Sequence, residues 1–307
     1  MKARDYARPY RITSGSRFHL ADIDPSEIRW VKKKNEAGEI LAQGVQVLSE
    51  LQERLYAQDR WAVLLIFQAM DAAGKDSTIE HVMSGVNPQG CQVFSFKGPS
   101  AEELDHDFLW RTSWRLPERG RIGIFNRSYY EETLVVRVHP ELLQSQKLPT
   151  ELITKDIWKE RFEDINALER YLTRNGTVVR KFFLHVSKEE QRRRFLKRLE
   201  EPEKNWKFSL ADAHEREHWD DYMHAYEDMI RHTATEHAPW YVIPADHKWF
   251  TRLVVASAVI GALDELKLDY PRVDSGKKRE LEEARRALEG EQGVKRRRVP
   301  RSSPRRP

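Results

Sequence analysis

The chain has 307 residues, 39% of them hydrophobic and 33% charged, enough to bury a core in one large α/β domain or two small ones. No stretch approaches the roughly 20 apolar residues of a membrane span, and the first residues lack the apolar segment of a secretory signal. A single cysteine, Cys91, excludes an internal disulfide framework and, with these absences, predicts a cytoplasmic protein without a membrane partner.

The net charge of +4 is unevenly distributed along the chain. Residues 294–307 hold seven bases and no acid, so the remainder carries a net charge of −3. A polyanion must therefore be bound by a local basic patch rather than by the field of the whole surface. We expect residues 271–307 to form a charged helix and a disordered basic tail that contacts polyanions.

Before this tail, the pattern of the chain predicts alternating helices and strands. Residues 1–33 are polar and interrupted by prolines and a glycine, which predicts an extended arm. Helices are predicted near 36–58, 76–84, 101–114, 155–174 and 247–268, and from capping boxes at 187–190 and 209–212. Strands are predicted at 61–67, 92–96, 121–125, 177–186 and 240–243. This alternation implies a parallel sheet of about five strands in a domain spanning residues 34–270.

The junction after the first predicted strand carries the strongest functional signal. The sequence Gln-Ala-Met-Asp-Ala-Ala-Gly-Lys-Asp-Ser-Thr at 68–78 leads from strand to helix. Backbone N–H groups at a helix N-terminus bind anions, and a lysine adds charge. Of the P-loop pattern G-x-x-x-x-G-K-[ST], Gly74 and Lys75 are present, while Ala69 and Asp76 depart from it. The alternative is a tight turn whose small residues serve packing alone.

Two acidic residues, Asp71 and Asp76, stand on either side of Lys75. Carboxylates this close to a phosphate would repel it unless a divalent cation lay between them. Mg²⁺ favours one or two carboxylates together with substrate phosphates, so we expect Mg²⁺ here, with Mn²⁺ as a substitute. Ser77 and Thr78 follow the usual hydroxyl position and are candidate phosphate ligands.

Polar residues also follow the other predicted strands, where ligands of parallel sheets bind. Lys97, Asn126, Arg127 and Asp246 occupy such positions.

Guanidinium groups match phosphate oxygens bidentately, which makes Arg111, Arg127 and Arg137 candidate clamps on a nucleotide. The alternative for these arginines is ordinary ion pairing with Glu131 or Glu132.

A second basic segment predicts a closing lid over residues 188–216. Its nine bases are Lys188, Arg192, Arg193, Arg194, Lys197, Arg198, Lys204, Lys207 and Arg216. The stretch 202–208 interrupts two capped helices, as a hinged helical hairpin would require. The alternative is a solvated helix face, which charge runs usually form.

Together these motifs resemble the polyphosphate kinase 2 family. The resemblance spans about residues 10–268 and rests on the ordered segments 67–78, 123–132, 134–139, 181–191, 202–209 and 238–246. It implies a three-layer P-loop kinase fold like that of thymidylate kinases, with a helical lid. It also implies Mg²⁺-dependent transfer of a terminal phosphoryl group between inorganic polyphosphate and nucleotides, and self-association into a dimer or tetramer.

The resemblance also implies roles for individual residues. Asp71, Lys75 and Asp76 would be the Walker A catalytic and metal-organising set, and Arg127 would lie in the Walker B segment. Arg194 and Arg198, with Lys204 and Lys207, would bind polyphosphate from the lid.

Asn126 stands where many relatives have aspartate, as in the family branch that accepts AMP as well as ADP. Nucleotide partners are therefore AMP, ADP and ATP, with GMP, GDP and GTP as further candidates.

Two other functions remain open from the sequence. An ATP-dependent nucleoside monophosphate kinase would share the fold but would need adenine recognition on the donor side. A nucleic-acid-binding module could instead use the Arg-rich tail, with steeply salt-dependent binding.

Overall fold

The apolar runs of the sequence form the strands of a single sheet in the computed structural model, which describes residues 5–31 and 33–295, with the backbone alone for residue 207 and residues 291–295. Six strands lie in the order β1-β6-β5-β2-β4-β3. They are β1 (Arg11–Ile12), β2 (Ala62–Gln68), β3 (Cys91–Ser95), β4 (Ile122–Asn126), β5 (Thr177–His185) and β6 (Trp240–Pro244).

The five predicted strands pair in parallel, which confirms the α/β prediction. The central strand β2 is buried along its whole length, as both faces of a parallel sheet require. The sixth strand, β1, was not predicted. It pairs antiparallel with β6, where Arg11 lies opposite Tyr241 and Ile12 opposite Trp240.

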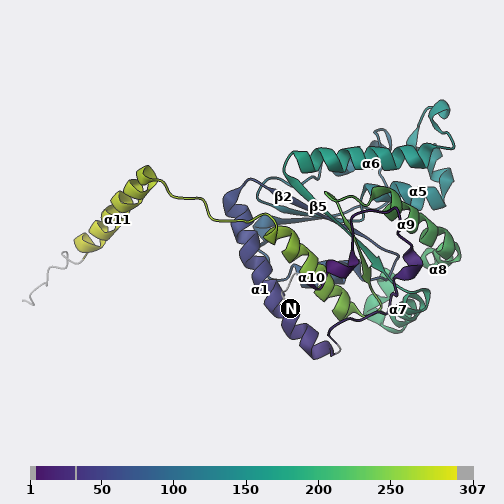
Figure 1. Ribbon diagram of the computed structural model, residues 1–307, viewed down its shortest axis with the longest axis horizontal. Helices are drawn as coiled ribbons and strands as arrows, with labels where there is room; N and C mark the ends of the chain where they lie inside the picture. The colour runs from purple at the N-terminus through teal and green to yellow at the C-terminus, as the bar shows by residue number, and fades with distance from the viewer. Residues whose placement is uncertain (1–4, 32, 296–307) are drawn as a thin grey trace, which may run out of the picture. The chain divides into compact units, whose positions relative to one another are not determined.

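Helices cover both faces of the sheet (Figure 1). On one face α1 (Lys34–Gln58) packs along α10 (Lys248–Asp264), and α10 also contacts α2 (Lys75–Val82). On the other face α6 (Ile157–Arg174) packs against β5 and against α9 (Trp219–Thr233). None of the described helices has the length and hydrophobicity needed to cross a membrane.

Shorter helices follow the strands or connect these layers. The α-helices are α3 (Ala101–Leu104), α4 (Trp110–Ser113), α5 (Val135–Val138), α7 (Lys188–Glu200) and α8 (Leu210–His214). The main 3-10 turns are η5 (Tyr129–Thr133), η6 (Pro140–Gln146), η8 (Pro202–Lys207) and η9 (Glu215–His218). The single helix predicted near 101–114 was wrong, because α3 and α4 are separate four-residue turns.

The chain divides into two units, Met1–Asp269 and Tyr270–Pro307. In the first unit, the described part of the N-terminal arm buries Tyr10, Phe18 and Leu20 in the main core. In the second unit, α11 (Ser275–Lys295) leaves every described side chain exposed.

A buried ion pair lies inside the core between β5 and α6. Lys181 Nζ lies 2.6 Å from Glu169 Oε2, and both side chains are fully buried. Lys181 also donates to the Thr233 carbonyl, and the hydroxyls of Tyr129 and Tyr130 donate to Glu169 Oε1. Each charge is therefore matched, as burial in a low-dielectric core demands.

Glu169→Gln should lower the free energy of unfolding by about 3–5 kcal/mol, because it leaves the Lys181 ammonium buried without a counter-charge. Urea denaturation measures this change. The matched control is Glu163→Gln, whose exposed partner Lys159 lies 3.8 Å away; we expect a change below about 0.5 kcal/mol there. Equal effects of the two substitutions would contradict the prediction.

Candidate active site

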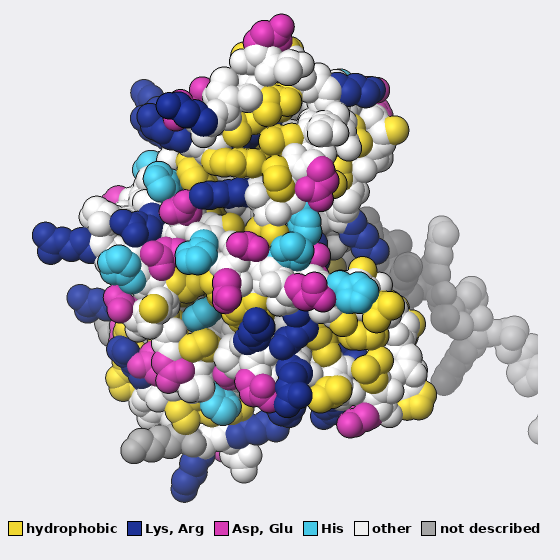
Figure 2. Space-filling model, turned by 90° about the vertical axis from the view of Figure 1, so that its right-hand side faces the viewer, with side chains coloured by type: hydrophobic (Ala, Val, Ile, Leu, Met, Phe, Trp, Pro, Cys, Tyr) yellow, Lys and Arg dark blue, Asp and Glu magenta, His cyan; other side chains and the backbone are white. Residues whose placement is uncertain are grey.

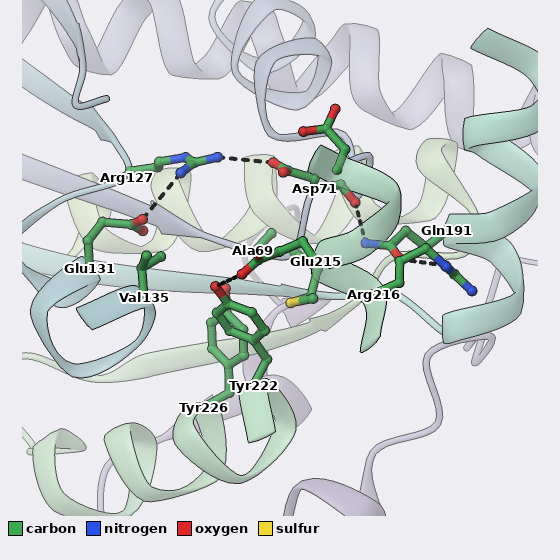
Figure 3. Close-up of a pocket in the computed structure, with 12 residues that line it drawn as sticks. Ala69, Asp71, Arg127, Glu131, Val135, Gln191, Glu215, Arg216, Tyr222 and Tyr226 are labelled. Atoms are coloured by element: carbon green, nitrogen blue, oxygen red, sulfur yellow. Dashed lines mark hydrogen bonds and ion pairs between the residues drawn. The ribbon is translucent and has the colours of Figure 1, made fainter. Parts of the chain in front are cut away.

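The carboxyl ends of β2, β4, β5 and β6 meet at one edge of the sheet, and a cleft of about 440 Å³ opens there (Figure 3). Its lining comes from the turn after β2, from the segment after β4 and from helices α7 to α9. The lining residues are Ala69, Met70, Asp71, Arg127, Glu131, Val135, Gln191, Asp212, Glu215, Arg216, Tyr222 and Tyr226.

The turn between β2 and α2 (the phosphate turn, residues 69–74) has the backbone of an anion-binding loop. Gly74 caps α2 with a φ of 102°, and Ala72 has a φ of 60°. The left-handed conformation at Gly74 favours glycine, which explains why this glycine of the P-loop pattern is kept. The first N–H groups of α2 have no partner within the helix, and they are the donors that an anion would meet.

Lys75 lies folded back over this turn. Its Nζ donates to the Ala69 carbonyl at 2.9 Å, and the residue is 9% exposed. Burial, followed by the nearby Arg127 guanidinium, lowers the pKa of Lys75, while Asp71 opposes the shift. An entering phosphate would supply the counter-charge that this buried ammonium lacks in direct contact.

Of the two hydroxyls after Lys75, only Ser77 remains near the turn surface. Its Oγ donates to the Gly74 carbonyl at 3.1 Å. Thr78 is buried, with 2% of its surface exposed, so its role as a phosphate ligand stays a prediction.

Arg127 links two of the acids that line the cleft, Asp71 and Glu131 (Figure 3). Its guanidinium lies 3.0 Å from Asp71 Oδ1 and 3.3 Å from Glu131 Oε2. The carboxylates of Glu131 and Asp71 raise the pKa of Arg127 despite its partial burial. Arg127 also has a φ of 64°, a strained conformation for a non-glycine residue. The strained backbone at Arg127 thus accompanies a guanidinium held beside the turn by Asp71.

Asp76 and Asn126 form the second link between the turn and β4. Asn126 Nδ2 donates to Asp76 Oδ1 at 2.7 Å. Asp71 and Asp76 are solvent-accessible and leave carboxylate oxygens available, so they fit a divalent cation shared with a phosphate. The described residues hold no cluster of three or more His, Cys, Asp and Glu side chains suited to a metal.

Three further candidates, Lys97, Arg111 and Arg137, are not among the residues that line the cleft. Arg111 Nη1 donates to the Lys97 carbonyl at 2.7 Å, and Arg111 lines a neighbouring hollow of about 300 Å³. The Lys97 side chain is exposed. Arg137 pairs with Asp228 of α9 at 2.6 Å, rather than with Glu131 or Glu132.

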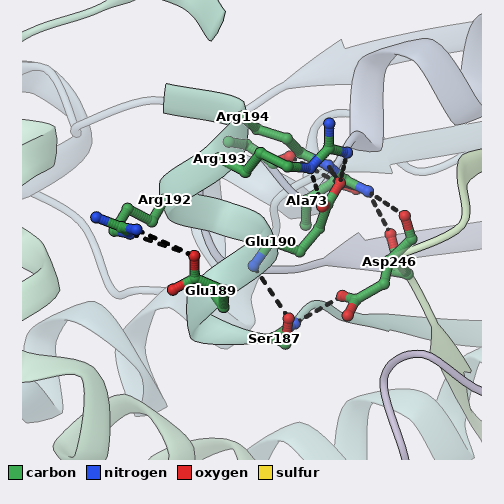
Figure 4. Close-up of polar contacts among 10 residues, drawn as sticks. Ala73, Ser187, Glu189, Glu190, Arg192, Arg193, Arg194 and Asp246 are labelled. Atoms are coloured by element: carbon green, nitrogen blue, oxygen red, sulfur yellow. Dashed lines mark hydrogen bonds and ion pairs between the residues drawn. The ribbon is translucent and has the colours of Figure 1, made fainter. Parts of the chain in front are cut away.

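Arg194 has a different setting from the rest of the predicted lid (Figure 4). It is 6% exposed, and its guanidinium donates to four backbone carbonyls and to Glu190. The carbonyls belong to Ala72, Ala73, Ala245 and Asp246, at 2.6–3.0 Å. Arg194 therefore braces the phosphate turn against the loop after β6, with no donor directed toward the open surface.

The remaining lid candidates lie on α7 and η8. Arg198 stacks over the Phe195 ring at 5.5 Å, and Lys204 pairs with Glu201. The side chain of Lys207 lies outside the described residues. On the face shown in Figure 2, Lys and Arg side chains gather in a band flanked by acidic side chains.

Gln191 is a site residue that the sequence did not single out. Its Nε2 donates to the Asp71 carbonyl at 3.0 Å, and its Oε1 accepts from Arg216 at 2.5 Å (Figure 3). Gln191 lies within the segment 181–191 that carried the family resemblance, but a neutral side chain gave no charge signal.

Arg194→Ala should lower the free energy of unfolding by about 3 kcal/mol, because four carbonyls lose their donor and Glu190 loses a buried partner. Guanidinium denaturation measures the change. Arg193→Ala is the matched control, since Arg193 pairs with the same Glu190 but is 66% exposed; less than about 1 kcal/mol is expected. Comparable losses for both variants would show that Arg194 is no brace.

Comparison with known proteins identifies the family of the chain. The polyphosphate kinase 2 family matches residues 31–271. An ADP-polyphosphate phosphotransferase of Rhodopseudomonas palustris is 53% identical over 92% of this chain and 98% of its own. An AMP/ADP-polyphosphate phosphotransferase of Meiothermus ruber is 43% identical over 87% and 97%. The crystal structure of polyphosphate kinase 2 from Arthrobacter aurescens superposes with a TM-score of 0.83 and 39% identity, covering 92% of this chain and 97% of that one. The chain belongs to the polyphosphate kinase 2 family.

Proposed function

We propose that this polyphosphate:nucleotide phosphotransferase moves a terminal phosphoryl group from inorganic polyphosphate to ADP or AMP, with Mg²⁺. The names of the relatives from R. palustris and M. ruber support these substrates. The single observation that carries the proposal is the phosphate turn itself. It places a buried lysine and the N-terminus of α2 beside two accessible aspartates.

The chain's own residues supply alignment and charge. Lys75 and the first N–H groups of α2 would bind the terminal phosphate of the donor. Arg127 would leave Asp71 and Glu131 in part to neutralise charge between donor and nucleotide. Because a nucleotide phosphate is already an anion near neutral pH, charge neutralisation contributes more than a strong base.

Asp71 and Asp76 would hold the metal ion, Mg²⁺ with Mn²⁺ as a substitute. When bound, such an ion neutralises phosphate oxygens and templates the two substrates. Asp71 is itself held through Arg127 and, by its carbonyl, through Gln191. These contacts position Asp71 in the lining of the cleft before substrate binds, while Arg127 is still paired with it.

Lys75→Ala should reduce turnover by about two to four orders of magnitude, because it removes the cation that contacts the transferred group. The assay mixes AMP, ADP, GMP or GDP with polyphosphate and Mg²⁺, without ATP, and measures the product nucleotide. Lys159→Ala, at an exposed lysine of α6, is the control and should retain wild-type turnover. Absence of product with the wild-type chain under every nucleotide would overturn the proposed function. Near-normal rates for Lys75→Ala would overturn the P-loop assignment.

Asn126→Asp tests the metal site without measuring turnover. It places a second carboxylate within hydrogen-bond distance of Asp76, so the metal-free protein should lose about 1 kcal/mol of stability through like-charge repulsion. Mg²⁺ should restore that loss, visible as a larger rise of Tm between EDTA and Mg²⁺ than in wild type. Asn126→Ala is the control and should show no such recovery. If Mg²⁺ shifts Tm equally in all three proteins, Asp76 does not face the metal.

A further inference from the structure

A pair of cations at the start of α10 lies beside the phosphate turn and outside the lining of the cleft. Lys248 and Arg252 are one helical turn apart and share a helix face. A Cβ added to Gly74 would lie 3.9 Å from Lys248 Cε and 3.9 Å from Arg194 Nη1. The Lys248 side chain therefore reaches the same glycine that caps α2.

Hydrogen bonds of Arg194 hold the start of α10, which carries this pair, close to the phosphate turn. The guanidinium of Arg194 binds carbonyls on both sides, Ala73 in the turn and Ala245 and Asp246 just before α10. Helix α10 also packs against α2. These contacts thus hold the start of α10 against the phosphate turn.

Neither cation forms a salt bridge within the described residues, although the Glu80 carboxylate on α2 partly offsets the burial that lowers the pKa of Arg252. No salt bridge or hydrogen bond links the Lys248 amine to a partner within the described residues, and Arg252 Nε is buried with no hydrogen-bond partner. Partial burial, then the Arg194 and Arg252 guanidiniums, lower the pKa of Lys248 to about 8, and Glu190 offsets this only in part. Gathering cations that form no salt bridge costs free energy, which an anionic ligand would recover.

The outer lid bases differ from this pair. Arg192 and Arg193 pair with Glu189 and Glu190 of their own helix, and Lys204 pairs with Glu201. A polyphosphate chain would have to displace these glutamates before it could bind there. It would displace no ion pair at Lys248.

The sheet order places this pair on the other side of the turn from Asn126 and Arg127, where we expect the nucleotide to bind. Strands β4 and β6 lie on opposite sides of β2. Asn126 and Arg127 follow β4, whereas Lys248 follows β6. Phosphoryl transfer requires the attacking and leaving oxygens in line across the transferred group, so the donor leaves the turn on the side away from the acceptor.

We propose that Lys248 and Arg252 bind the inner phosphates of the polyphosphate donor, those that follow the terminal phosphoryl group held by the turn. This inference rests on the proposed function. It also assigns donor selectivity, because two unpaired cations suit a continued string of phosphates and offer nothing specific to the nucleobase of ATP.

The test compares donor and acceptor constants in Lys248→Ala, Arg252→Gln and the double variant. For long-chain polyphosphate the KM of the double variant should rise about tenfold or more, as expected for the loss of charge-assisted contacts. The KM for ADP and kcat should stay within about twofold. With tripolyphosphate as donor the rise in KM should be clearly smaller, since few phosphates would extend beyond the turn.

Two controls separate binding from structural damage. Lys248→Arg keeps the charge and should retain most of the affinity for long polyphosphate. Lys159→Ala, on the opposite face of the sheet, should leave every constant unchanged. If arginine fails to rescue at an unchanged Tm, or if KM rises equally for ADP and polyphosphate, the inner-phosphate assignment is overturned.

An unchanged KM for long polyphosphate in Lys248→Ala, with an active wild-type chain, would likewise overturn it. An inactive wild-type chain with polyphosphate would instead overturn the proposed function, so the two failures are distinguishable. If the double variant does not fold, the single Lys248→Ala measurement decides.

Discussion

The buried guanidinium of Arg194 is the interaction on which the active-site edge depends. The phosphate turn and the loop after β6 each present carbonyl oxygens that no strand or helix satisfies, and Arg194 donates to both sets. Buried carbonyls without donors are costly. One side chain from the lid helix thus fixes the turn, the start of α10 and its own helix relative to one another. Glu190 completes the arrangement by neutralising the buried charge.

Around this turn most charged side chains of the site contact one another, which suits a site that binds highly charged substrates. Arg127 contacts Asp71 and Glu131, and Asp76 accepts from Asn126. Such contacts are partly exposed and individually weak, so phosphate oxygens and a metal ion can exchange with them at little cost. Lys75 and Lys248 are the exceptions, since each lacks a carboxylate in hydrogen-bond contact in the described structure.

The sequence predicted the parallel strands and the turn because both depend on local patterns. A seven-residue, mostly apolar strand followed by Gly74 and Lys75 can be recognised from the local sequence, without knowing which strands lie beside it in the sheet. The role of Arg194 could not be predicted in this way, since its partners lie about 50 and 120 residues away in the chain. In sequence it was one of nine bases. Arg137 was placed with nucleotide binding for the same reason, although its partner Asp228 lies on α9. The two-residue strand β1 was too short to produce any alternation.

That short strand has a consequence for how the molecule is made. Arg11 and Ile12 close the edge of the sheet at β6, yet β6 is synthesised about 230 residues later, which is roughly 10–50 s at ordinary translation speeds. During that interval the buried rings of Tyr10 and Phe18 have no final place to pack. The few apolar side chains of this otherwise polar arm therefore stay exposed to solvent until the last strand of the sheet has been made.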